Sequence, residues 1–133
     1  MNDYELRVQS LGLSPQMEVM TFLMEGLNTS DKKSQVTFLD VRNEQEVQES
    51  KLEMNKEGIS CHYIPCTVDD CEGLKQQASD LFPDINAPLI LFCRSGRRAA
   101  SAKKCLVDLG YTKVCNAGGL TDLNQMIEKC LVK

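Results

Sequence analysis

The amino-acid sequence predicts an α/β fold built on a mostly parallel sheet. An unbroken apolar run at residues 89–92, Leu-Ile-Leu-Phe, is typical of a central strand covered on both faces. A second apolar run at residues 36–41 also predicts a buried strand, and apolar residues at helical spacing follow the run at 89–92. Strands that alternate with helices form parallel sheets, and such sheets bind ligands at the carboxyl ends of their strands.

Length and composition favour one globular domain that spans residues 1–133. The 133 residues are 42% hydrophobic and 26% charged, which is enough for a core that needs no metal ion or disulfide. A net charge of −4 argues against general nucleic-acid binding. The amino terminus lacks the features of a signal peptide and no stretch reads as a membrane span, so we expect a cytoplasmic protein with no membrane partner.

The first third of the chain predicts a short strand followed by a helix. Residues 4–8 have a weak strand pattern. A helix is expected next, with Ser14 as its N-cap, Pro15 at its first position and an apolar stripe that ends near Leu27.

The strand at residues 36–41 ends in a charged pair, Asp40 and Arg42. Such a pair lies where α/β sheets keep their sites, but it can equally anchor a loop, and we interpret it as structural support for a neighbouring loop. A short helix at 43–48 is expected to follow, with Asn43 as N-cap and Glu46 in the capping-box position.

The second half repeats the alternation of strand and helix. A short strand at 62–64 is followed by a helix expected from Thr67 to Leu81 or Phe82. Beyond the central strand and its helix, residues 112–115 predict a last strand and Gly118-Gly119 a turn. The closing helix is expected at 121–131, with Leu123, Met126, Ile127 and Cys130 on its inner face.

Cys93 lies at the junction between the central strand and a basic helix that stops at Gly110. The loop at 93–98 contains three arginines and a glycine, and no acidic residue occurs between Pro88 and Asp108. A helix start with nearby guanidinium groups stabilises a thiolate, and successive backbone N–H groups there can hold an anion. We therefore interpret Cys93 as a nucleophile whose substrate is bound by the loop. The proposed binding residues are Arg94, Ser95, Gly96, Arg97 and Arg98.

Cys93, the other cysteines and the single histidine also have simpler interpretations. Cys93 could be one of seven small apolar fillers and its arginines a solvated face, but their grouping at a helix start favours the nucleophile. The seven cysteines form no C-x-x-C pair and the chain has one histidine, His62, so no metal site and no disulfide framework are expected. We interpret His62 as a packing or surface residue, not as the base for Cys93.

Three sequence segments together resemble one known family. They are Leu39-Asp40-Val41-Arg42 with Glu46, Cys93-Arg94-Ser95-Gly96-Arg97-Arg98, and Gly110-Tyr111 leading to Asn116-Ala117-Gly118-Gly119-Leu120. From about Val36 onward the chain resembles a single-domain rhodanese, a thiosulfate sulfurtransferase. Two departures stand out: Ser50-Lys51-Leu52 replaces the usual Gly-His-Ile segment, and Leu123 occupies the position of a usual aromatic residue.

The resemblance implies a rhodanese-like fold with a five-stranded, mostly parallel sheet and helices on both faces. It also implies that Cys93 carries the persulfide and that residues 94–98 form the cradle around its sulfur. The expected reaction moves sulfur from thiosulfate or a similar donor to a thiol, cyanide or a thioredoxin-like protein, and it requires no cofactor.

Two alternatives from other classes remain. Cysteine phosphatases and arsenate reductases of related architecture use a C-x5-R loop, which would need arginine at position 99, where this chain has Ala99. A loop of six residues from Cys93 to Arg98 fits a sulfur atom better than a tetrahedral phosphoryl group. A non-catalytic rhodanese-like interaction module is the other alternative, although an intact cysteine and three loop arginines favour catalysis.

Overall fold

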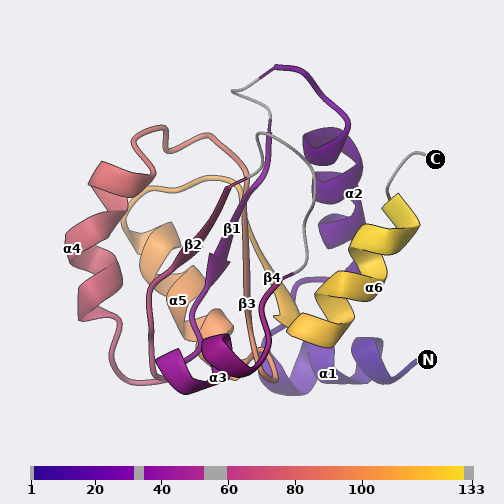
Figure 1. The fold of residues 1–133 in the computed structure, drawn as a ribbon, viewed down its shortest axis with the longest axis horizontal. Coiled ribbons are helices and arrows are strands. Elements are labelled where there is room, and N and C mark those ends of the chain that lie inside the picture. The colour runs from indigo at the N-terminus through magenta and orange to yellow at the C-terminus, as the bar shows by residue number, and fades with distance from the viewer. Residues whose placement is uncertain (1, 32–34, 53–59, 131–133) are drawn as a thin grey trace.

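A parallel sheet forms the middle layer of the computed structural model, which describes residues 2–31, 35–52 and 60–130 (Figure 1). The described residues form four strands in the order β2-β1-β3-β4. These strands are β1 (Thr37–Asp40), β2 (Ser60–Tyr63), β3 (Leu89–Cys93) and β4 (Val114–Gly119). Strand β3 is interior and every one of its residues is buried, as its apolar sequence predicted.

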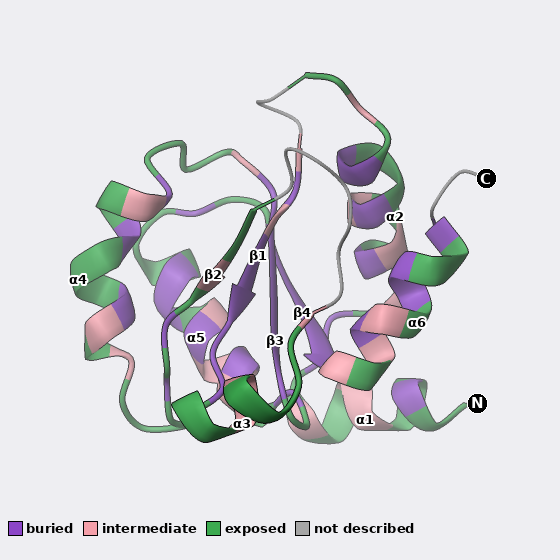
Figure 2. Cartoon of the chain, in the orientation of Figure 1, coloured by how far each residue is buried: buried purple, intermediate pink, exposed green. Residues whose placement is uncertain are grey.

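Helices cover both faces of the sheet. They are α1 (Asp3–Leu11), α2 (Gln16–Leu27), α3 (Glu44–Glu49), α4 (Glu72–Leu81), α5 (Arg97–Asp108) and α6 (Leu120–Cys130). Helices α4 and α5 pack on one face, while α1, α2 and α6 pack on the other, so two apolar cores lie on either side of the strands. Figure 2 shows buried residues along β1, β3 and β4 and on the inward sides of the helices that pack on the sheet, whereas β2 is mostly exposed. Helix α3 has no buried residue and lies at the carboxyl edge of the sheet.

The described sheet has four strands where five were expected, and the expected strand at residues 4–8 is wrong. That segment belongs to α1, because local signals for a helix outweigh the weak strand pattern. The side chain of Asn2 accepts a hydrogen bond from the Glu5 backbone N–H at 2.8 Å and caps the helix. Asp3 and Glu5 also place negative charge in its first turn, and Gly12 ends it in a left-handed conformation with φ of 76°.

Three other boundaries differ from the sequence expectation. Pro15, not Ser14, is the N-cap of α2, and the Ser14 hydroxyl instead accepts a hydrogen bond from the Asn116 backbone N–H at 2.8 Å. Helix α4 begins at Glu72, because residues 67–70 form a turn closed by the Thr67 N–H and the Asp70 carbonyl. Gly118 and Gly119 end strand β4 and do not form a separate turn.

Other expectations are confirmed. Asn43 and Glu46 form the capping box of α3, with each side chain accepting a hydrogen bond from the other residue's backbone N–H. The predicted inner face of α6 is buried, although position 131 of the expected helix lies outside the described residues. None of the helices in the described ranges is both long and apolar enough to cross a membrane.

Asn116 in β4 joins three segments at the carboxyl edge of the sheet. Its side-chain amide donates hydrogen bonds to the Gly96 carbonyl at 2.8 Å and to the Gly12 carbonyl at 3.0 Å. Its side-chain oxygen accepts one from the Gly118 N–H at 3.0 Å. Since Asn116 is fully buried, these contacts fix the cysteine loop, the end of β4 and the connection between α1 and α2 in one arrangement.

Replacing Asn116 with alanine tests this arrangement. The Asn116→Ala variant should lower the free energy of unfolding by about 2–4 kcal/mol, because each buried polar group left without a partner costs about 1–3 kcal/mol. Urea denaturation measures the change. The matched control is Asn86→Ala at an exposed position, where about 0.5 kcal/mol or less is expected. Equal losses in the two variants would contradict the role of Asn116.

Candidate active site

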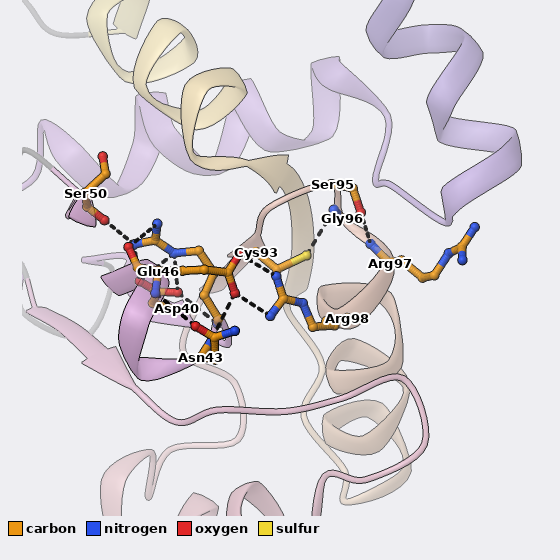
Figure 3. Close-up of polar contacts among 10 residues, drawn as sticks. Asp40, Asn43, Glu46, Ser50, Cys93, Ser95, Gly96, Arg97 and Arg98 are labelled. Atoms are coloured by element: carbon orange, nitrogen blue, oxygen red, sulfur yellow. Dashed lines mark hydrogen bonds and ion pairs between the residues drawn. The ribbon is translucent and has the colours of Figure 1, made fainter. Parts of the chain in front are cut away.

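Cys93 ends strand β3 and is fully buried at the carboxyl edge of the sheet. Its Sγ accepts a hydrogen bond from the Gly96 backbone N–H at 3.0 Å (Figure 3). Between the Leu91 and Cys93 pairings the register of β3 with β4 shifts, an irregularity of the kind that redirects a side chain next to a functional site. The sulfur is therefore held by the backbone of the loop that follows it.

Gly96 lets the cysteine loop turn into helix α5. It is the N-cap of α5 with a left-handed φ of 106°, which favours glycine, and a Cβ there would collide with the side chain of Leu13. No acidic residue occurs in the first turn of α5. The N–H of this N-cap donates to the Cys93 sulfur, so the sulfur lies at the positive end of the helix dipole without a competing carboxylate from the first turn.

Arg98 connects the cysteine loop to α3. Its guanidinium donates two hydrogen bonds to the Glu46 carboxylate, at 2.7 and 2.9 Å. This contact is the main reason that the pKa of Glu46 is lowered and that of Arg98 raised, and the Cys93 sulfur raises the pKa of Arg98 further. The same Glu46 side chain forms the capping box of α3, so one carboxylate fixes both α3 and the arginine beside the sulfur (Figure 3).

Asp40 and Arg42 form a buried ion pair behind the site. The Arg42 guanidinium contacts both carboxylate oxygens of Asp40, with one nitrogen–oxygen distance of 2.8 Å, and this pairing raises the pKa of Arg42. Arg42 also donates to the backbone carbonyls of Glu46 at 3.3 Å and Ser50 at 2.6 Å. Through these contacts Arg42 connects the end of β1 to the first turn of α3 and to its C-cap, Ser50.

Cys93 is one of the residues that line a cavity of about 750 Å³. The cavity is lined by Asp3, Arg7, Arg42, Glu46, Glu49, Ser50, Cys93, Arg94, Ser95, Gly119, Leu120, Thr121 and Asp122. Arg94 is exposed on this wall and has no ion-pair partner among the described residues. Arg97 is not one of the lining residues, and in Figure 3 its side chain extends away from Cys93.

The predicted loop residues thus take different positions relative to the cavity and to the Cys93 sulfur. Arg94 and Ser95 line the cavity, Gly96 binds the sulfur through its N–H, and Arg98 lies beside the sulfur but is paired with Glu46. Arg97 contributes a backbone N–H that donates to the Ser95 hydroxyl at 3.4 Å. Of the three loop arginines, Arg94 is therefore the one whose charge is free to meet an anion in the cavity.

The model of the Rhodanese-like domain family matches residues 24–125. The chain belongs to this family. It is 40% identical over 50 residues to the thiosulfate sulfurtransferase PspE of Escherichia coli strain K12, a match that covers 38% of this chain and 48% of that protein. The chain therefore matches about half the length of this curated relative. A solved structure described as a rhodanese with anions from E. coli is 31% identical, has a TM-score of 0.53 and covers 65% of this chain and 89% of its own.

The rhodanese-like domain has cavity residues that the sequence did not reveal. Arg7 of α1 forms two hydrogen bonds with the Asp122 carboxylate at the start of α6, at 3.0 and 2.8 Å. Asp3 completes this group, with an oxygen 3.2 Å from Arg7 Nε. Arg7 and Asp122 are far apart in the sequence, so no local pattern signals their contact, and α1 lies outside the residues that the family model matches.

His62 and the cysteines other than Cys93 are not among the residues that line this cavity. The His62 ring packs edge-on against Phe82, with centroids 5.2 Å apart, and β1 separates its strand from β3. These positions match the interpretation of His62 as a packing residue. Burial raises the pKa of five other cysteines and disfavours their thiolate forms. These thiols belong to Cys61, Cys66, Cys105, Cys115 and Cys130.

The Glu46–Arg98 pair should make stability depend on acidic pH. The folded-state pKa of Glu46 lies below its ordinary value of 4.5, so the pair stabilises the fold above that pH and the contribution is lost as pH falls through the folded-state pKa. Near neutral pH, Glu46→Gln should lower the free energy of unfolding by about 1 kcal/mol. Urea denaturation at several pH values should show this difference shrinking toward zero in acid. A difference that persists unchanged at pH values well below 4.5 would contradict the assignment.

Proposed function

We propose that this rhodanese-like domain is a sulfurtransferase that carries sulfane sulfur as a persulfide on Cys93. The observation that supports it most is that Cys93 lines the cavity while its sulfur accepts the Gly96 N–H where helix α5 begins. A nucleophilic sulfur needs an environment that stabilises its anion and an opening that admits the donor, and this site offers both. The similarity to a protein named thiosulfate sulfurtransferase supports the same chemistry.

The first step loads the sulfur. The Cys93 thiolate attacks the outer sulfur of thiosulfate, a new sulfur–sulfur bond forms on Cys93, and the donor's own sulfur–sulfur bond breaks. Its electron pair leaves with sulfite, so one dianion enters and another departs. Arg94 and the N–H groups at the start of α5 would stabilise this charge as it moves, and the hydrogen bond between Asn116 and Gly96 fixes the start of the helix before the donor binds.

The second step unloads the sulfur. A nucleophilic acceptor attacks the outer persulfide sulfur, and the Cys93 thiolate leaves and is regenerated. A thiol, cyanide or a thioredoxin-like protein has the required nucleophile, and each is proposed as an acceptor class. Both steps exchange sulfur between nucleophiles, so the proposed reaction requires no cofactor.

The spacing of the cysteine loop favours sulfur transfer over phosphoryl chemistry. Arg98 follows Cys93 after four residues, and position 99 is a buried alanine. The Arg98 guanidinium directs two of its donors to Glu46, so it does not offer a bidentate contact to a tetrahedral anion above the sulfur. Anion binding is therefore assigned to the backbone N–H groups and Arg94.

The proposed persulfide can be tested by mass. Protein incubated with thiosulfate should gain one sulfur atom on Cys93, and cyanide should remove it as thiocyanate, because the outer sulfur is electrophilic toward a soft nucleophile. Intact-mass and peptide mass spectrometry measure the adduct. Cys93→Ser should abolish it, while the control Cys61→Ser, at an exposed thiol, should keep it. Aryl-phosphate hydrolysis without any thiosulfate-dependent adduct would overturn the proposal, and absence of both activities would favour an interaction module.

The loop arginines should differ in their effect on the donor. Arg94→Gln should raise the KM for thiosulfate about tenfold, since a hydrogen bond to a charged group contributes about 1.5–3 kcal/mol. The matched control Arg97→Gln removes the same charge from a side chain that points away from the sulfur, and it should change the KM little. Steady-state kinetics at two salt concentrations measure both, and added salt should weaken the wild type more than Arg94→Gln. Equal effects of the two substitutions would contradict the assignment of donor binding to Arg94.

A further inference from the structure

Carboxylates surround the cavity in which an anionic donor would bind. Four of them line it: Asp3, Glu46, Glu49 and Asp122. Unpaired carboxylates in a partly enclosed space repel an incoming anion, because the low local dielectric strengthens the interaction. Arg98 neutralises Glu46. The net charge that a donor meets in the cavity therefore depends on whether the other three carboxylates are paired with positive charges.

Arg7 supplies the pairing charge for the wall formed by α1 and α6. Its guanidinium binds both oxygens of Asp122 and lies 3.2 Å from Asp3. The Arg7 and Asp122 side chains are only 25% and 19% exposed, so solvent screens this pair less than a surface ion pair. Asp122 is the main cause of the raised pKa of Arg7, which keeps the guanidinium charged.

We propose that Arg7 is a specificity-determining residue that allows anionic donors to reach Cys93 by neutralising Asp122 and offsetting part of the charge of Asp3. This inference rests on the proposed function, because it concerns the donor of the same cysteine. It assigns part of the donor site to α1, a helix outside the residues matched by the family model. Arg7 acts through the charge of the cavity wall and not as a direct ligand, since its bidentate contact is already used by Asp122.

The position of Asp122 explains why its charge would matter. The Gly119 N–H donates to Asp122 Oδ2 at 3.0 Å, and the Gly119 backbone packs against the carbonyl of Arg94. Gly119 thus contacts both Asp122 and Arg94, the loop arginine that we assign to donor binding. If Arg7 is removed, this carboxylate faces the cavity unpaired and opposes the attraction of Arg94.

The test compares two alkylating reagents of similar size on Cys93, anionic iodoacetate and neutral iodoacetamide. Peptide mass spectrometry gives the ratio of their rates. Arg7→Gln should lower the iodoacetate-to-iodoacetamide ratio about fivefold or more at low salt, as expected when charges facing an anion are left unpaired. The matched control Lys104→Gln removes a positive charge from an exposed position of α5 outside the cavity and should leave the ratio unchanged.

A second substitution separates charge from structure. In the double variant Arg7→Gln/Asp122→Asn the ratio should return toward the wild-type value, because the unpaired carboxylate is gone while an amide oxygen can still accept the Gly119 N–H. Arg7→Lys should retain most of the ratio, and Asp122→Asn alone should raise it. Thermal unfolding checks that each variant folds, and if Arg7→Gln does not, the Arg7→Lys and Asp122→Asn results decide.

The outcomes separate this inference from the proposed function. An unchanged ratio in Arg7→Gln, or a loss that Asp122→Asn does not rescue, would overturn the role of Arg7. The alkylation ratio does not require sulfur transfer, so it tests Arg7 even if no persulfide forms. Intact mass after thiosulfate treatment of the same wild-type preparation tests the proposed function, and absence of the adduct there would overturn that function alone.

Discussion

The site depends on the buried amide of Asn116. Its nitrogen donates hydrogen bonds to two glycine carbonyls, and its oxygen accepts one from a glycine N–H. Because the side chain has no exposed surface, water cannot replace these partners. The hydrogen bond to Gly96 sets where helix α5 begins, and the Gly96 N–H in turn binds the Cys93 sulfur. One side chain in β4 therefore fixes the position of the Cys93 sulfur relative to the segment that joins α1 to α2.

The distribution of charge around the cavity follows from pairing. Arg7, Arg42 and Arg98 each bind a carboxylate through at least two contacts, so most of the positive charge near Cys93 stabilises the structure. Arg94 and the N–H groups of the loop remain to meet an anion. Such a site suits the proposed exchange of thiosulfate for sulfite, because donors that are already in place can stabilise charge as it moves between the two anions.

Local sequence signals predicted much of this structure. The apolar run of β3, the capping box of Asn43 and Glu46, and the grouping of Cys93 with arginines at a helix start are all features of neighbouring residues. Residues 4–8 have only a weak strand pattern, and the stronger local signal, the cap at Asn2, makes them a helix. The contacts of Arg7 with Asp122 and of Asn116 with Gly96 join distant segments, which periodicity and spacing do not report. Sequence also treats Arg94, Arg97 and Arg98 alike, since only side-chain direction and pairing separate them.

A crystal structure of the thiosulfate-treated protein would test most directly whether the loop forms a cradle for sulfur. The expected result is one additional sulfur bonded to Cys93 Sγ, surrounded by the N–H groups at the start of α5, with the hydrogen bond between Asn116 and Gly96 retained. An unmodified Cys93 beside a sulfur bound to another cysteine would contradict it. So would an added sulfur that the loop can hold only by breaking its contact with Asn116.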